Sequence, residues 1–185
     1  FQHFSISEHI SFATYFRILI PEVIDSSIEK VLYLDTDIVV AQNIMELWNV
    51  DITNYHFAAI PEPTFNEHAR LDIPFGAKYF NAGILLINLK KWREEKVSNQ
   101  VLNFIDANAE KIIFWDQDAL NAVLYNKWLA LPLKWNQQSV FFEKEISNTR
   151  IDKTELREAI RNPSIIHFTG ASKPWEYINF HPFKY

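Results

Sequence analysis

The sequence has 185 residues, 48% of them hydrophobic and 15% aromatic, and its formal net charge at pH 7 is −5. This is enough apolar material for one substantial core, and we expect residues 1–185 to form a single domain. The charge is not gathered into a basic block, which excludes an extended nucleic-acid surface, and the lack of cysteine excludes thiolate catalysis, cysteine-based zinc sites and disulfides.

The apolar residues follow periods that predict both helices and strands. In chain order the predicted elements are a capping box at residues 5–8, a helix at 10–20, strands at 31–34, 38–40 and 56–60, a long loop to residue 78, a strand at 84–87, helices at 90–109 and 117–125, a strand at 128–133, a helix at 151–161 and a strand at 164–168. The first helix is expected to end at Pro21. Strands that alternate with helices favour an α/β fold.

Two carboxylates interrupt the first predicted strand, in Leu34-Asp35-Thr36-Asp37-Ile38. Side chains two residues apart in an extended chain point to the same side, and open α/β sheets bind ligands beyond the ends of their strands. A divalent cation such as Mg²⁺ or Mn²⁺ would hold both carboxylates together and bind a diphosphate as well. The alternative is a solvated turn after a strand.

The chain has three glycines, Gly76, Gly83 and Gly170, so it can form neither a glycine-rich dinucleotide loop nor a P-loop. A phosphorylated ligand would then be neutralised by a metal and by lysine or arginine side chains. The segment from His167 to Lys173 supplies an imidazole, a glycine turn and an ammonium group. This combination indicates a metal and phosphate site, and a surface loop with a hydrogen-bonded histidine is the alternative.

Two further segments place polar side chains at the ends of predicted elements. Asn81 precedes a strand, where its amide can hydrogen-bond a sugar hydroxyl. Asp116-Gln117-Asp118 lies at a predicted helix start, where the helix dipole alone also favours acids. Each segment by itself leaves a purely structural role open.

Five motifs carry a family resemblance. They are Ala13-Thr14-Tyr15-Phe16-Arg17, Val31-Leu32-Tyr33-Leu34-Asp35-Thr36-Asp37, Tyr79-Phe80-Asn81-Ala82-Gly83, Asp116-Gln117-Asp118, and His167-Phe168-Thr169-Gly170 with Lys173-Pro174-Trp175. In this order they resemble glycosyltransferase family 8, which includes glycogenin and bacterial lipopolysaccharide galactosyl- and glucosyltransferases. The resemblance covers about His9 to Trp175.

The resemblance implies a GT-A fold, a Rossmann-like α/β architecture with a mixed central sheet flanked by helices. It implies transfer of a hexose from UDP-glucose or UDP-galactose to a glycan or lipid-linked saccharide of lipopolysaccharide type, with retention of configuration and with Mn²⁺, or Mg²⁺, as cofactor. The implied metal ligands are Asp35, Asp37 and His167. The residues implied to bind nucleotide or sugar are Arg17, Asp35, Asp37, Glu62, Asn81, Ala82, Asp116, Gln117, Gly170 and Lys173.

The resemblance also places Asp116, Gln117 and Asp118 at the catalytic centre. Retaining glycosidases use a carboxylate nucleophile, and no carboxylate in this sequence is an evident counterpart. Gln117 could stabilise an oxocarbenium-like species during substitution on one face of the sugar, or Asp118 could be a covalent nucleophile; we favour the first. Glu62 stands where many relatives carry a sugar-binding aspartate, which leaves the donor sugar open.

Family members begin with a strand and a helix that hold uracil and ribose, and we expect this N-terminal βα segment to be missing from the sequence. One alternative is therefore a non-catalytic or truncated sugar-nucleotide-binding domain. Another is a haloacid-dehalogenase-type phosphatase, because residues 34–39 also resemble the first motif of that class of enzyme. No apolar run approaches the ~20 residues that span a bilayer, and we expect a cytoplasmic protein, with peripheral association at the inner face of the membrane left open.

Overall fold

The computed structural model describes residues 12–142, 146, 149, 151–170, 173–175 and 182–183. The capping box predicted at residues 5–8 lies outside this part of the chain. The strands are β1 (Lys30–Leu34), β2 (Ile38–Val40), β3 (Phe57–Pro61), β4 (Phe80–Asn88), β5 (Trp128–Ala130) and β6 (Ile165–His167). Each segment predicted to be extended contains a strand, although β4 is longer and β5 shorter than predicted.

The larger of two sheets is mixed. Its strand order is β1-β4-β3-β5, with β1 and β3 antiparallel to β4 and with β5 parallel to β3. β2 and β6 form a separate antiparallel pair. The sequence predicted β2 as the continuation of one buried strand, and this was wrong: the chain turns at Asp35–Asp37 into the second sheet, where Val39 and Val40 are exposed.

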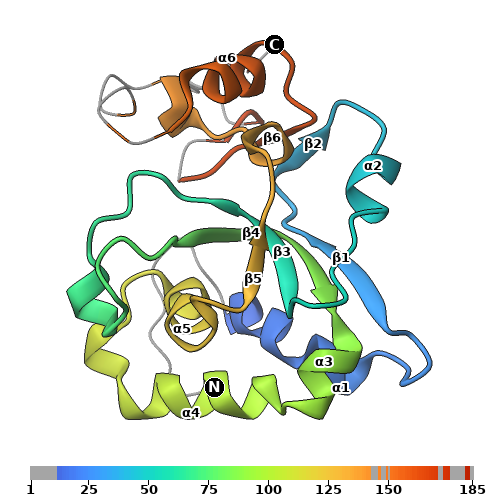
Figure 1. The fold of residues 1–185 in the computed structure, drawn as a ribbon, viewed down its shortest axis with the longest axis vertical. Coiled ribbons are helices and arrows are strands. Elements are labelled where there is room, and N and C mark those ends of the chain that lie inside the picture. Colours follow the sequence, from blue (N-terminus) through green and yellow to red (C-terminus); the bar gives the residue numbers. More distant parts are fainter. Residues whose placement is uncertain are drawn as a thin grey trace.

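Helices flank the larger sheet on both sides. The α-helices are α1 (Ile20–Val23), α2 (Met45–Trp48), α3 (Leu89–Glu94), α4 (Val97–Ala107), α5 (Trp115–Leu124) and α6 (Lys153–Arg161), and 3₁₀ segments occupy Phe12–Leu19, His68–Leu71, Ala109–Lys111, Leu133–Asn136 and Ser139–Phe142. In Figure 1 the layer with α1, α3, α4 and α5 lies below the sheet, and α6 lies above it with β2 and β6. This is the predicted α/β architecture.

Alternate residues of the central strands pack into opposite layers, because side chains alternate along an extended chain. The cluster on the α4 side includes Phe57, Ala59, Leu85 and Ile87 from the sheet with Trp92, Val101 and Leu120 from the helices. The cluster on the α6 side includes Ala58, Ile60, Ile84 and Leu86 with Leu47, Ala159 and Ile165. Burial on both faces explains why β3 and β4 are almost continuously apolar.

Two predicted helices differ from the structure. The helix predicted at 90–109 is two helices, separated at Lys96, whose φ of 53° is left-handed; the break allows Trp92 and Val97 to pack into the same cluster. The helix predicted to end at Pro21 continues to Val23, because Pro21 lies in the first turn of α1, where no backbone N–H is needed. Across the described residues, none of the helices has the length and apolar character needed to cross a bilayer.

Candidate metal centre and active site

Three potential metal ligands meet where the two sheets join. Asp35 follows β1, Asp37 precedes β2, and His167 ends β6. One ligand atom from each residue lies within 4.8 Å of the other two. His167 Nε2 is 3.2 Å from Asp37 Oδ1 and 3.7 Å from Asp35 Oδ2. The pairing of β2 with β6 therefore brings the predicted ligand set together from distant parts of the sequence.

Gly83 leaves the space that these ligands need. Its carbonyl accepts a hydrogen bond from Asp35 N at 2.8 Å, so β4 runs directly against the cluster. A Cβ atom at this position would lie 2.2 Å from His167 Cε1 and 2.9 Å from Asp35 Oδ2. Because no side chain fits there, close approach is what requires glycine at this position.

Hydrogen bonds fix which nitrogen of His167 carries a proton. Asn81 Oδ1 accepts from Gly83 N at 3.0 Å and from Asn136 Nδ2 at 2.9 Å. The oxygen of the Asn136 amide then faces His167 Nδ1 at 2.8 Å, so Nδ1 is the nitrogen that donates. Nε2 is then the nitrogen that faces the two carboxylates, and it is the atom that a neutral imidazole would offer to a cation. Metal-binding histidines are typically oriented by a second hydrogen bond of this kind.

This donor set fits a hard divalent cation. Two carboxylate oxygens and an imidazole nitrogen are ligands that Mn²⁺ accepts, and a cation between them would neutralise the two carboxylates. Lys173 Nζ donates to Asp37 Oδ2 at 2.5 Å and to Phe168 O at 2.8 Å. Burial alone would raise the pKa of Asp37, but neighbouring His167 and Lys173 outweigh burial and lower it. Gly170 has a φ of 86°, which glycine adopts readily.

A buried guanidinium lies behind the carboxylates. Arg17 is only 8% exposed; its Nε lies 2.7 Å from Asp116 Oδ2 and its Nη1 lies 3.4 Å from Asp35 Oδ1. Arg17 Nη1 also donates to Ala82 O, and Thr14 Oγ1 donates to Asp116 Oδ1 at 2.9 Å. The predicted Arg17 and Asp116 thus form an ion pair that joins the 3₁₀ segment Phe12–Leu19 to the first turn of α5, and Arg17 also faces Asp35 at the end of β1.

The ionisation of Asp116 predicts a pH dependence of stability. Burial, opposed only in part by Arg17 and Thr14, raises the pKa of Asp116 from 3.8 to about 6. Between these values the folded protein binds more protons than the unfolded chain, so this group lowers the free energy of unfolding as the pH rises. We expect the free energy of unfolding of the wild type, minus that of Asp116→Asn, to fall from about pH 4 to about pH 6 in urea denaturation. A difference that is flat or rises would contradict this assignment.

Gln117 and Asp118 are neighbours in sequence but have different surroundings. Gln117 is half-buried, and its Oε1 accepts a hydrogen bond from Ala82 N at 2.8 Å. Asp118 is fully buried. Its carboxylate accepts hydrogen bonds from the backbone of Ile113 and Phe114, the hydroxyl of Tyr79 and the guanidinium of Arg70. Gln117 therefore lies beside the predicted site residue Ala82, whereas Asp118 belongs to a buried network behind it.

A pocket of about 640 Å³ adjoins this network. Glu62 lies in its wall, where burial raises the pKa of the carboxyl and a hydrogen bond from Thr64 Oγ1 at 2.9 Å only partly opposes the shift. Tyr79 lines the same pocket, and its hydroxyl accepts a hydrogen bond from Gln117 Nε2 at 3.2 Å. The predicted sugar-binding Glu62 thus shares a pocket with a residue that contacts Gln117.

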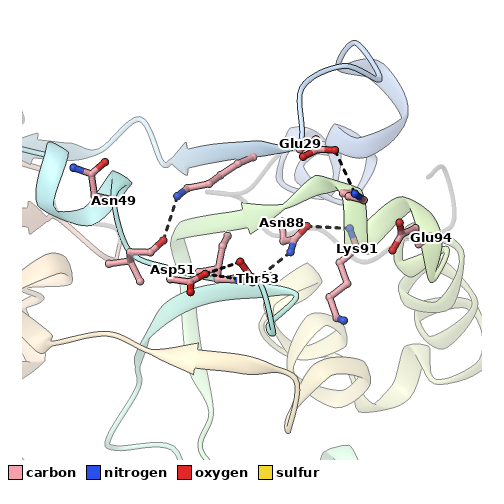
Figure 2. Close-up of a pocket in the computed structure, with 11 residues that line it drawn as sticks. Glu29, Asn49, Asp51, Thr53, Asn88, Lys91 and Glu94 are labelled. Atoms are coloured by element: carbon pink, nitrogen blue, oxygen red, sulfur yellow. Dashed lines mark hydrogen bonds and ion pairs between the residues drawn. The ribbon is translucent and has the colours of Figure 1, made fainter.

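A second pocket, of about 430 Å³, lies at the other end of the larger sheet, where Lys30 begins β1 and Asn88 ends β4 (Figure 2). Its polar groups are largely bonded to the pocket's own wall. Asn88 donates to Ile52 O and accepts from Lys91 N, and Lys30 donates to Val50 O. Within the part of the chain that the structure describes, this pocket holds no group of three metal-binding side chains.

Several residues for which no role was predicted contact the predicted site residues. Tyr33 OH donates to Asp35 Oδ1 at 2.7 Å, Asn136 orients His167, and Arg70 binds Asp118. Asn136 begins a run of three amides that the structure buries, but nothing in the sequence marks them as buried or indicates a histidine as the partner.

Comparison with known proteins agrees with this arrangement. The family model described as Glycosyl transferase family 8 matches residues 1–179. The chain belongs to glycosyltransferase family 8. General stress protein A of Bacillus subtilis (strain 168) is 35% identical over 189 residues, covering 100% of this chain and 66% of that protein. Lipopolysaccharide 1,2-glucosyltransferase of Escherichia coli (strain K12) is 27% identical over 174 residues, covering 92% of this chain and 51% of that protein.

Among solved structures, galactosyltransferase LgtC in complex with donor and acceptor sugar analogues has a TM-score of 0.88 and 26% identity to this chain. The match covers 100% of this chain and 68% of LgtC. This likeness confirms the GT-A fold, and family membership leaves no support for the haloacid-dehalogenase alternative. The chain spans less than two thirds of the length of the two curated relatives.

Proposed function

We propose that this family 8 chain is the core of a retaining hexosyltransferase. It would move glucose or galactose from a UDP-sugar to a glycan or lipopolysaccharide-type acceptor, with Mn²⁺ as cofactor. The observation that carries the proposal is the cluster of Asp35, Asp37 and His167, which leaves room for its ligand atoms only because residue 83 is glycine. The lipopolysaccharide glucosyltransferase and the galactosyltransferase LgtC among its relatives support the class of sugar and acceptor.

The residues around the cluster have separate tasks in this proposal. Asp35, Asp37 and His167 would hold the cation, which when bound neutralises the diphosphate and acts as a Lewis acid for the departing UDP. Lys173 supplies a positive charge beside Asp37 for the phosphates, and the turn at Gly170 lets backbone N–H groups approach them. Arg17 acts mainly by holding the carboxylates in place, because its guanidinium is already engaged by them.

The donor sugar would lie against Asn81, Ala82, Asp116 and Gln117. Gln117 presents a carboxamide whose orientation is fixed by Ala82 N, so its oxygen can face the positive charge that develops on the sugar during same-face substitution. Asp118 is fully buried and both of its carboxylate oxygens accept hydrogen bonds, from four residues in all, which supports a positioning role over that of a covalent nucleophile.

The acceptor would enter the pocket beside Tyr79. This pocket is lined by Glu62 and by Phe75, an aromatic side chain that is 92% exposed. Exposed aromatic rings with a few polar groups are typical of ligand pockets, and the link from Tyr79 to Gln117 brings this one to the proposed reaction centre. A cytoplasmic location at the inner face of the membrane, which would give access to lipid-linked acceptors, stays a prediction.

Thermal unfolding with Mn²⁺ and UDP, separately and together, tests the proposal. A ligand that binds only the folded state at about 100 times its Kd stabilises by about 2.7 kcal/mol, which corresponds to a rise in Tm on the order of 5–10 °C for a chain of this size. We expect this rise only when both ligands are present. If neither this chain nor any longer natural form that contains it shows the rise, the proposed function is wrong.

UDP release separates the enzyme from its non-catalytic alternative. With UDP-glucose or UDP-galactose and Mn²⁺, a transferase releases UDP slowly to water and faster with an acceptor sugar. A protein that shows the thermal shift but releases no UDP from either donor, in any natural form, would be a sugar-nucleotide-binding domain and not an enzyme.

A further inference from the structure

Gln117 is held from behind by a chain of hydrogen bonds that ends in a salt bridge. Gln117 Nε2 donates to Tyr79 OH at 3.2 Å, and Tyr79 OH donates to Asp118 Oδ1 at 2.8 Å. Arg70 then binds Asp118 with both terminal nitrogens, Nη1 to Oδ2 at 2.8 Å and Nη2 to Oδ1 at 3.3 Å. The chain connects the loop that follows β3 to the first turn of α5.

The direction of each bond in this chain is determined. Ala82 N can only donate, so the Gln117 atom that faces it at 2.8 Å is the oxygen, and the nitrogen faces Tyr79. Burial, and then the neighbouring Asp118 carboxylate, raise the pKa of Tyr79 above its ordinary value, so the hydroxyl keeps its proton. It therefore accepts from Gln117 and donates to Asp118.

The end of this hydrogen-bond chain at Asp118 is buried and held by several contacts. Asp118 is fully buried and Tyr79 is 3% exposed, and the two-pronged contact with Arg70 is the strong, geometrically specific form of a charge-assisted bond. Tyr79 is also stacked on Phe65, with ring centroids 3.7 Å apart. Removal of the hydroxyl alone would therefore leave the ring in place.

The backbone beside this anchor is strained. Trp115, the first residue of α5, has a φ of 47°, which bulky residues adopt only where neighbouring contacts hold them. Asp118 supplies such contacts, because its Oδ2 accepts from Ile113 N at 2.8 Å and from Phe114 N at 2.7 Å. The same carboxylate thus holds the turn that leads into α5 and, through Tyr79, the side chain of Gln117.

We infer that Arg70, Tyr79 and Asp118 are positioning residues that fix the carboxamide of Gln117. The inference deepens the proposed function, in which Gln117 faces the donor sugar. Arg70 and Asp118 hold each other in place, and Tyr79 joins them to Gln117 by hydrogen bonds. A carboxamide held at both its oxygen and its nitrogen loses little freedom when the reaction begins, which is the property required of a preorganised dipole.

Nuclear magnetic resonance tests the geometry without any need for activity. In the ¹⁵N-labelled chain, the side-chain NH₂ pair of Gln117 is assigned by its loss in Gln117→Ala. We expect Tyr79→Phe to shift this pair and to speed its exchange with water, because one N–H loses its acceptor. Tyr125→Phe is the matched control, since Tyr125 packs in the same apolar cluster as Tyr79. An unchanged Gln117 pair in Tyr79→Phe would overturn the inference.

Kinetics test the consequence. We expect Tyr79→Phe to lower kcat about tenfold, the loss that corresponds to one well-placed hydrogen bond, and to change KM for the donor by less than about twofold. In a Gln117→Ala background the same substitution is expected to leave kcat unchanged, because residues that act through one another are not additive. Independent, multiplying effects of the two substitutions would overturn the inference, as would a loss that appears only in Tm.

The results distinguish a failure of this inference from a failure of the proposed function. A wild type that releases no UDP would contradict the transferase, while the resonance of Gln117 would still decide whether Tyr79 positions it. If Tyr79→Phe does not fold, Arg70→Lys replaces it: this substitution keeps the charge beside Asp118 but removes the two-pronged contact. It is expected to shift the same Gln117 pair, and an unchanged pair would again overturn the inference.

Discussion

The variant Asp37→Asn is expected to lower UDP release about 1000-fold at saturating Mn²⁺. A bound cation supplies several kcal/mol of charge stabilisation in the transition state, and each 1.36 kcal/mol corresponds to a factor of ten. An amide in place of the carboxylate keeps the shape of residue 37 but removes the charge that faces His167 Nε2 at 3.2 Å. The combined effect of Mn²⁺ and UDP on Tm is expected to vanish with the activity.

Asp106→Asn is the matched control for this prediction. Asp106 is exposed near the end of α4, on the layer opposite to β2 and β6, so the same change of chemistry there should leave both activity and the ligand-dependent Tm unchanged (Figure 1). A tenfold loss of activity corresponds to roughly the energy of one hydrogen bond. If Asp37→Asn retains a tenth or more of the activity, residue 37 is not a ligand of the essential cation.

Gly83→Ala is expected to damage both folding and cation binding. An alanine Cβ would lie 2.2 Å from His167 Cε1, and the imidazole cannot retreat because its Nδ1 is bonded to Asn136. Overpacking of this kind costs about 1–3 kcal/mol, so Tm should fall on the order of 2–10 °C. Loss of a residue that only supports a metal ligand typically weakens metal binding by about 10- to 100-fold. Because Gly83→Ala displaces a ligand itself, we expect it to weaken Mn²⁺ binding by more than about 100-fold. Calorimetric titration of UDP-loaded protein with Mn²⁺ measures it.

Gly76→Ala separates these two effects. Gly76 has a φ of 83°, so alanine there costs about 1–2 kcal/mol of backbone strain, while its Cβ meets nothing within 4 Å. This variant should lose comparable stability and keep its affinity for Mn²⁺. Equal affinities in the two alanine variants would show that Gly83 does not protect the cation site.

The sequence was sufficient to predict three side chains that the structure brings together, and most of the elements that hold them. Asp35 and Asp37 are two residues apart, and His167 ends a short apolar run, so local pattern singles out each of them, and the family resemblance assigns them to one metal site. The break at Lys96 was not predictable, because it depends on how Trp92 and Val97 share one cluster.

The supporting residues of the site were also beyond local pattern. Asn136 acquires its role only when the 3₁₀ segment Leu133–Asn136 packs beside β6, and Arg70 only when its loop packs on α5. Such partners are set by tertiary packing, so no spacing in the sequence marks them. For the same reason the resemblance of its motif assigns Asp118 to the predicted catalytic centre, but its hydrogen bonds with Tyr79 and Arg70 could not be predicted.

The junction between the two sheets has a consequence for how the protein acquires its cation. Asp35 lies at the end of the large sheet, whereas Asp37 and His167 depend on the small one, whose strands β2 and β6 are far apart in sequence. Contacts between residues so distant in sequence close long loops and tend to form late in folding. The large sheet and its helices can therefore be assembled before the three side chains meet, and affinity for Mn²⁺ would report the pairing of β6 with β2.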